Sequence, residues 1–166
     1  MLTQTKVLVG STAVLYAKYL VTLSIQGSKR FAAGTRPPED KIFKSLNPTQ
    51  ATQTFGLQPA ASTAAAEADV RWQRIVRNDL ENIPLGLLVA WAAVNSGGNE
   101  LVNSVAIGTF TGARLFHTYA YANGLQPHRG YAWTLGVLSV SVLALNSIYG
   151  IVVDETPPSP PSKISK

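Results

Sequence analysis

Four long runs of apolar residues follow one another along the chain, and polar segments separate them. They cover residues 7–25, 80–94, 101–125 and 131–153. At a rise of about 1.5 Å per residue, the first run crosses a hydrocarbon core about 30 Å thick, and it is longer than the core of a signal peptide. The charged segment 70–79 leads into the second run without a helix breaker between them, so both belong to one helix. The pattern predicts four membrane-spanning helices at about residues 7–26, 67–95, 101–123 and 129–153.

The short connections between these spans predict an antiparallel four-helix bundle, which makes the chain an all-α membrane protein with one domain over residues 1–153. Residues 47–66 are low in complexity and predict a mobile loop, and residues 154–166 carry too few apolar side chains to order themselves. Basic residues flank the first and third connections, but none lies in the connection at 95–100. The positive-inside tendency therefore places the first and third connections in the cytosol and both termini on the far side.

The composition excludes several classes of protein. The 166 residues include no cysteine, which excludes a disulfide scaffold, a cysteine zinc site and a thiol nucleophile, and with two histidines no metal site is expected. Only 14% of the residues are charged, against about 25% in a soluble domain. The net charge of +5 is compatible with nucleic-acid binding, but the basic residues at the cytosolic connections already account for it. No nucleic-acid partner is expected.

Polar side chains inside a predicted span need a partner, a wet cavity or a function, because a charge at mid-membrane costs about 2.5–3.5 kcal/mol. One stripe of the second helix holds such residues at intervals of three, four and three: Arg71, Arg74, Asn78 and Glu81. Arg77 borders the stripe and can pair with Glu81 at i,i+4. A ladder of salt bridges at the membrane surface is the alternative interpretation, above all for Arg71.

The third helix carries Arg114, His117 and Tyr121 on one face, at positions i, i+3 and i+7. Lys18, in the first helix, is expected to face the bundle or to extend toward the membrane surface. Arg129 lies at the N-terminal end of the fourth helix, where the helix dipole and free N–H groups favour an anion. Since these stripes meet at the cytosolic ends of their helices, they predict a basic, aromatic-lined cleft for an anionic, flexible, peptide-sized ligand.

Three motifs in this chain resemble the superfamily of membrane-associated proteins in eicosanoid and glutathione metabolism (MAPEG), and they are most similar to its microsomal glutathione transferases. The motifs are Arg74-Ile-Val-Arg-Asn-Asp-Leu-Glu-Asn82, Gly112-Ala-Arg-Leu-Phe-His-Thr-Tyr-Ala-Tyr121 and Gln126-Pro-His-Arg-Gly130. The resemblance implies a homotrimer that binds glutathione, a co-substrate, between neighbouring subunits at the cytosolic side. It implies glutathione contacts or catalytic roles for Arg74, Arg77, Asn78, Glu81, Arg114, His117, Tyr121 and Arg129.

The chain departs from the family pattern in a few places. Val76 stands where the family usually has a histidine, and Gly130 stands where prostaglandin synthases have a serine. The second departure weakens the resemblance to prostaglandin synthases but leaves the general transferase resemblance intact. The reactive cysteine of the microsomal transferase has no counterpart here, so no activation by thiol modification is expected.

The expected activity is that of a membrane-bound glutathione S-transferase. It would join the glutathione thiolate to hydrophobic electrophiles or, as a peroxidase, reduce lipid hydroperoxides at the bilayer. Arg129 is predicted to stabilise the thiolate, with Tyr121 as a second donor, because lowering a thiol pKa from about 8.5 to about 6.5 requires about 2.7 kcal/mol. The arginines are expected to bind the carboxylates of glutathione, and Glu81 is expected to bind its ammonium group. Glu81 is also expected to balance the positive charge of Arg74, Arg77 or Arg114.

Two other functions stay open at this point. One is a prostaglandin E or leukotriene synthase-like isomerase or transferase, which differs from the first prediction only in its second substrate. The other is a non-catalytic membrane protein that keeps the fold for assembly or lipid binding. The resemblance implies a detoxification role in the endoplasmic reticulum or the mitochondrial outer membrane, with the active-site face in the cytosol.

Overall fold

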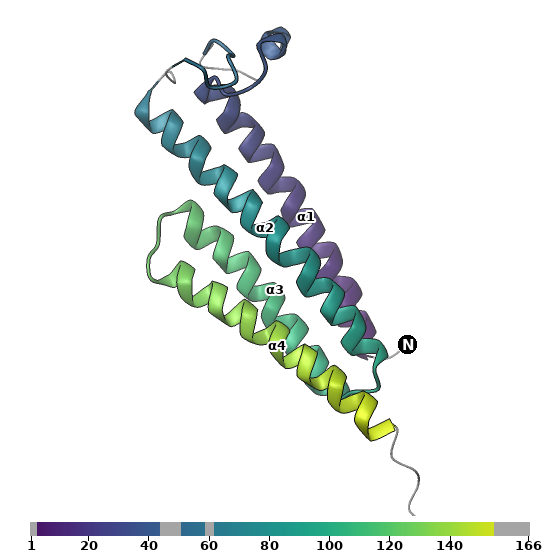
Figure 1. Cartoon of the computed structure of the whole chain (residues 1–166). Coiled ribbons are helices and arrows are strands. Elements are labelled where there is room, and N and C mark those ends of the chain that lie inside the picture. Colours follow the sequence, from purple (N-terminus) through teal and green to yellow (C-terminus); the bar gives the residue numbers. More distant parts are fainter. Residues whose placement is uncertain (1–2, 44–50, 59–61, 155–166) are drawn as a thin grey trace, which may run out of the picture.

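The computed structural model describes residues 3–43, 51–58 and 62–154. Its elements are α1 (Thr3–Ala33), the short 3-10 helix η1 (Pro38–Ile42), α2 (Thr63–Asn95), α3 (Glu100–Ala122) and α4 (His128–Asp154). The four α-helices run up and down in turn, so the α1–α2 and α3–α4 connections lie at one end of the bundle (Figure 1). The start of α1, the α2–α3 connection and the end of α4 lie at the other end. The prediction of an all-α, four-helix bundle is confirmed.

The first two helices are longer than the apolar pattern predicts. The helix α1 continues past residue 26 through polar residues and ends before Gly34, whose positive φ of 75° suits glycine. The helix α2 begins at Thr63, because the Ser62 side chain accepts a hydrogen bond from the Ala65 N–H at 3.1 Å and caps the helix. The last residues of the predicted loop 47–66 are therefore helical.

Another part of that predicted loop, residues 51–58, packs on the end of α1. The buried Gln53 side chain donates to the Phe31 carbonyl oxygen at 2.9 Å and accepts from the Arg36 backbone N–H at 3.2 Å. The predictions for residues 44–50, 59–61 and the tail 155–166 lie outside the described residues.

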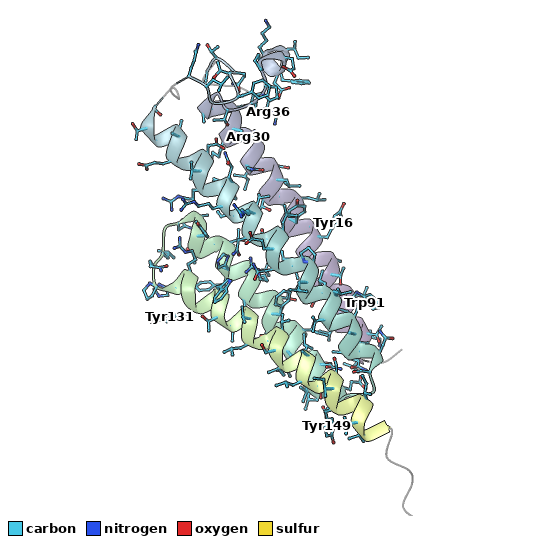
Figure 2. The ribbon with its side chains drawn as sticks, in the orientation of Figure 1. Tyr16, Arg30, Arg36, Trp91, Tyr131 and Tyr149 are labelled. Carbon is cyan, nitrogen blue, oxygen red and sulfur yellow. The ribbon has the colours of Figure 1, made fainter. Side chains whose placement is uncertain are left out.

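The exterior of the bundle is apolar. Within the described residues, α1 and α4 are long and apolar enough to cross a membrane, and most residues of their apolar stretches are not buried inside the chain. Three exposed aromatic residues lie near helix ends, namely Trp91, Tyr131 and Tyr149, and a fourth, Tyr16, lies in the middle of α1 (Figure 2). In membrane proteins, tryptophan and tyrosine are enriched near the ends of the spans, where the protein meets the membrane–water interface. The exterior therefore suits a bilayer, and membrane crossing by α2 and α3 stays a prediction.

Buried amide groups join all four helices at the end where α1 starts. The Asn103 Nδ2 group of α3 donates to Gln4 Oε1 of α1 at 2.8 Å and to the Ala93 carbonyl oxygen of α2 at 2.9 Å. The Asn146 Nδ2 group of α4 donates to Asn103 Oδ1 at 2.8 Å. These bonds satisfy amides that would otherwise be costly to bury. They fix the bundle at the end opposite the α1–α2 connection.

The middle of the bundle has an apolar core that α1, α2 and α3 share. Leu15, Ile83 and Phe110 form one buried cluster, and the Phe110 ring lies directly against Gly86 of α2. Toward the end with the α1–α2 connection, the buried side chains become polar and include Asp79, Arg114 and His117. The candidate site is built on this polar end.

Candidate functional site

The first turns of α2 extend beyond the α3–α4 connection (Figure 1). A groove lies at this point. Its volume is about 420 Å³, and three helices line it: α2 with Ala66, Glu67, Val70, Arg71 and Arg74, α3 with Tyr121 and α4 with Arg129. Four of the α2 residues are spaced i, i+3, i+4 and i+7, so they lie on one face of the helix. The wall of the groove is thus an extension of the predicted stripe toward the start of α2.

Tyr121 lies at the centre of the contacts in this groove. The Arg129 guanidinium stacks on the Tyr121 ring at 4.3 Å from the ring centroid, in cation–π geometry. The Arg71 Nη1 group donates to the Tyr121 carbonyl oxygen at 3.3 Å, and the His117 ring meets the Tyr121 ring edge-on at 5.7 Å. These neighbours restrict the ring, so the structure brings together Tyr121 and Arg129, the two predicted catalytic residues.

The start of α4 differs from the sequence-based expectation. The Arg129 backbone N–H donates to the Leu125 carbonyl oxygen at 3.1 Å, and the N–H groups of Gly130 and Tyr131 donate to the Pro127 carbonyl oxygen at 2.9 and 3.2 Å. Because the connecting turn already satisfies these donors, they are not free to bind an anion. The positive character of the groove at this point comes from the Arg129 guanidinium.

The groove has an excess of unpaired positive charge. It contains three arginines, Arg71, Arg74 and Arg129, and one carboxylate, that of Glu67. Among the described residues, the ion pairs are Lys18–Asp79, Arg36–Asp40, Arg77–Glu81 and Arg114–Asp79, and none uses a groove residue. An anionic ligand can therefore bind the groove arginines without breaking an ion pair among the described residues.

Arg77 and Glu81 do not line the groove of this chain. The Arg77 Nε group and Glu81 Oε1 form the predicted i,i+4 pair at 2.9 Å, with side chains 82% and 55% exposed. Glu81 also lines a smaller pocket of about 160 Å³ between α2, α3 and α4, together with Asn82 and Trp133. Within one chain, these two predicted ligands are thus separated from Arg74, Tyr121 and Arg129.

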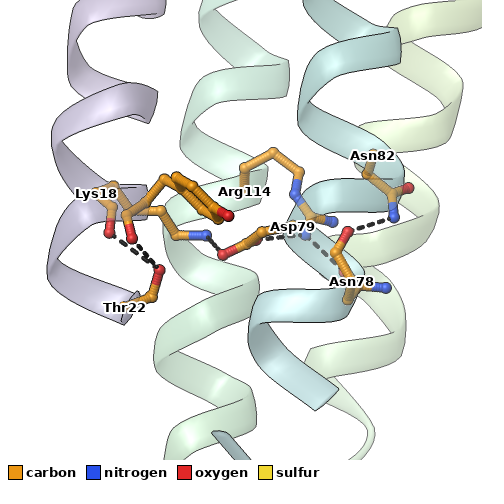
Figure 3. Close-up of polar contacts among 7 residues, drawn as sticks. Lys18, Thr22, Asn78, Asp79, Asn82 and Arg114 are labelled. Carbon is orange, nitrogen blue, oxygen red and sulfur yellow. Dashed lines mark hydrogen bonds and ion pairs between the residues drawn. The ribbon is translucent and has the colours of Figure 1, made fainter. Parts of the chain in front are cut away.

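Arg114 and His117 lie beneath the surface of the site. Both are buried, and among the described residues His117 Nδ1 has no hydrogen-bond partner. Arg114 is held by Asp79 at 2.9 Å, and its Nη2 group also donates to Asn78 Oδ1 at 2.6 Å (Figure 3). The carboxylate that balances Arg114 is therefore Asp79, whereas the sequence analysis considered only Glu81 for that role.

Sequence reasoning missed Asp79 and Glu67. Asp79 also binds Lys18 of α1, with the Nζ atom 2.5 Å from Oδ2, which makes Lys18 a bundle-facing residue. The signal in the sequence was Lys18 itself, because a cation inside an apolar run needs an acidic partner at a similar depth. Glu67 lies one helical turn before Arg71 and thus on the same stripe. Among the described residues, no cluster of three or more His, Asp or Glu side chains could hold a metal ion.

The family model of the MAPEG family matches residues 8–149, a span that includes the groove and the three motifs described above. No curated protein sequence matches the chain. The family match confirms the resemblance that the motifs indicated, and the branch of the family stays a prediction.

Proposed function

We propose, from the premise that this chain belongs to the MAPEG family, that it is a membrane-bound glutathione S-transferase. The family is membrane-associated and includes glutathione transferases, prostaglandin E synthases and leukotriene synthases. The proposed reaction joins the sulfur of glutathione to a hydrophobic electrophile that arrives through the bilayer. Reduction of a lipid hydroperoxide by the same thiolate is a second proposed activity.

The groove between α2, α3 and α4 carries this proposal, because its charges complement those of glutathione. Glutathione has two carboxylates, one ammonium group and one thiol, and the groove offers three guanidinium groups and one carboxylate. Arginine binds carboxylates with two parallel hydrogen bonds, which gives orientation as well as affinity. The groove volume of about 420 Å³ also falls within the range of small-molecule sites.

Arg129 is the proposed activator of the thiol. A guanidinium near the sulfur favours the thiolate, and the thiolate is the form that attacks an electrophile. Stacking on Tyr121 holds the Arg129 side chain in place, and the Tyr121 hydroxyl is a second proposed donor to the sulfur. In the reaction with an aromatic halide, the sulfur lone pair forms the carbon–sulfur bond, the halide leaves with its bonding electrons, and the thiol proton passes to solvent.

The remaining predicted ligands fit the proposal if a neighbouring subunit completes the site. Arg77 and Glu81 are exposed and do not line the groove of their own chain, so a second copy can reach them. We therefore propose a homotrimer in which glutathione contacts groove residues of one subunit and Arg77, Asn78 and Glu81 of a neighbour. We also propose that the groove faces the cytosol, the compartment that supplies glutathione, in the endoplasmic reticulum or the mitochondrial outer membrane.

The test is glutathione conjugation to an activated aromatic halide by the protein purified in detergent. The parent protein is expected to turn over, and Arg129→Ala is expected to lower kcat about a hundredfold while changing the Kd for glutathione by less than about threefold. Arg129→Lys should recover part of the loss, since it keeps the charge but not the planar geometry.

Lys41→Ala is the matched control. It removes one positive charge from an exposed residue of η1 at the same end of the molecule, and its kcat should equal that of the parent. A well-folded parent that neither conjugates glutathione nor reduces a lipid hydroperoxide would refute the proposal. Equal turnover by Arg129→Ala and the parent would refute the role of Arg129.

A further inference from the structure

Asp79 lies between two cations in the interior of the bundle (Figure 3). Its Oδ2 atom is 2.5 Å from Lys18 Nζ of α1, and its Oδ1 atom is 2.9 Å from Arg114 Nη2 of α3. The side chains of Lys18, Asp79 and Arg114 are 9%, 0% and 1% exposed. Such buried charges persist only when they are paired and hydrogen-bonded, so this triad holds each of its members in one place.

Arg114 makes a second contact that leads toward the surface. The same Nη2 atom donates to Asn78 Oδ1 at 2.6 Å. A guanidinium has only donors, so the Asn78 atom that faces it has to be the amide oxygen, and the NH₂ group points the other way. The Asn82 Nδ2 group donates to the backbone carbonyl oxygen of Asn78 at 2.8 Å, so Asn82 contacts the Asn78 backbone and not its side chain. Among the described residues, no hydrogen bond uses Asn78 Nδ2 as a donor.

We infer that Arg114, anchored by Asp79, is a positioning residue that holds the Asn78 amide so that its NH₂ group faces the ligand. This inference rests on the proposed function and adds to it the kind of atom that Asn78 binds. An NH₂ group only donates, so its partner is an acceptor: a carboxylate or peptide carbonyl oxygen of glutathione. Arg114 itself is buried and acts through Asn78, which distinguishes it from Arg74 and Arg129 in the groove.

A double-mutant cycle with Arg114→Met and Asn78→Ala separates action through Asn78 from direct contact. Methionine has a similar length without the charge, and Asp79 keeps Lys18 as its partner, so the buried carboxylate is not left alone. Each single variant should weaken glutathione binding about tenfold, as measured by equilibrium dialysis with glutathione. The double variant should bind no more weakly than Asn78→Ala alone. If the double variant instead binds glutathione about a hundredfold more weakly than the parent, the two effects are independent and the inference is overturned.

Asn82→Ala is the matched control for this cycle. Its amide contacts the Asn78 backbone and not Arg114, so its effect should multiply with that of Arg114→Met. Arg114→Lys is a second variant for the case in which Arg114→Met does not fold. It keeps a charge beside Asp79 and should recover part of the affinity.

A second readout needs no ligand. The changes in melting temperature of the same variants are measured in detergent without glutathione. The changes caused by Asn78→Ala and Arg114→Met should not add in the double variant, whereas those caused by Asn82→Ala and Arg114→Met should add. If the parent binds no glutathione, the proposed function fails, and this melting cycle still decides whether Arg114 holds Asn78. Additive melting shifts for Asn78 and Arg114 would overturn the inference whatever the parent binds.

Discussion

Glu67 and Glu81 are two carboxylates of α2 with different surroundings. Glu67 lines the groove beside Arg71 and Arg74 and has no ion-pair partner among the described residues, whereas Glu81 already pairs with Arg77. A single carboxylate facing three guanidinium groups is suited to the ammonium group of a zwitterionic peptide. The geometry of one subunit therefore favours Glu67 over Glu81 as the ammonium ligand.

The variant Glu67→Gln is expected to weaken glutathione binding about tenfold, because it removes one charge-assisted hydrogen bond. It should leave unchanged the binding of a glutathione analogue that lacks the α-amino group. Glu39→Gln is the matched control: it removes a carboxylate from an exposed residue of η1 at the same end of the molecule and should change the glutathione Kd by less than about twofold. If Glu81→Gln, and not Glu67→Gln, removes the preference for glutathione over this analogue, the ammonium group binds Glu81 of a neighbouring subunit instead.

Spacing along a helix predicts which residues share a face, and this is why Arg114, His117 and Tyr121 were found together. It does not predict how deep each of them lies. Arg114 and His117 are buried and Tyr121 lines the groove, because α3 packs on the other helices along part of that face. Asp79 was missed for a related reason: its partners lie on α1 and α3, and pairing between helices cannot be read from spacing within one helix.

At the scale of the elements, the apolar pattern predicts all four helices and both ends of α3 and α4 to within one residue, but α1 and the start of α2 extend beyond the predicted bounds. An apolar run marks the part of a helix that faces lipid or core, and a helix continues beyond it wherever its ends are well capped. Ser62 caps α2 before an alanine-rich stretch, and Gly34 follows α1, so both helices extend further than the membrane pattern predicts. The extension of α2 adds Ala66 to the residues that line the groove.

The contact between α2 and α3 depends on the missing side chain at Gly86. A Cβ atom built there would lie 2.3 Å from the Cζ atom of the buried Phe110 ring. The variant Gly86→Ala should lower the free energy of unfolding by about 1–3 kcal/mol, since the ring has to shift within a packed core. The decrease is measurable as a lower melting temperature in detergent.

Gly10→Ala is the corresponding control, because a Cβ atom at Gly10 of α1 would meet nothing within 4 Å. This variant should keep the melting temperature or raise it slightly, since alanine favours the helical backbone over glycine. Equal destabilisation by Gly10→Ala and Gly86→Ala would contradict the proposed packing of Phe110 on α2.

At the scale of the whole molecule, the bundle has two different ends. The amide bonds of Gln4, Asn103 and Asn146 join the helices at one end, and the groove with its arginines opens at the other. The up-and-down order of the helices places the α1–α2 and α3–α4 connections on the same side as the groove (Figure 1). The direction in which the protein sits in the membrane therefore decides which compartment supplies its ligand.

A protease added to sealed microsomes is expected to cut the α1–α2 connection, within residues 34–62, and to leave a C-terminal tag intact. The basic residues around this connection favour the cytosolic side. Microsomes opened with detergent are the control and should lose both the connection and the tag. A digested tag with an intact connection would place the groove in the lumen and contradict the proposed supply of cytosolic glutathione.

The pairing of Lys18 with Asp79 also has a consequence for synthesis. A chain made from its N-terminus delivers Lys18 to the membrane 61 residues before Asp79 exists. A lone cation at the centre of a span costs about 2.5–3.5 kcal/mol, so the newly made α1 is poorly suited to a central position in lipid by itself. The ion pair therefore makes the placement of α1 depend on the later arrival of α2, and it links the insertion of α1 to the translation of α2.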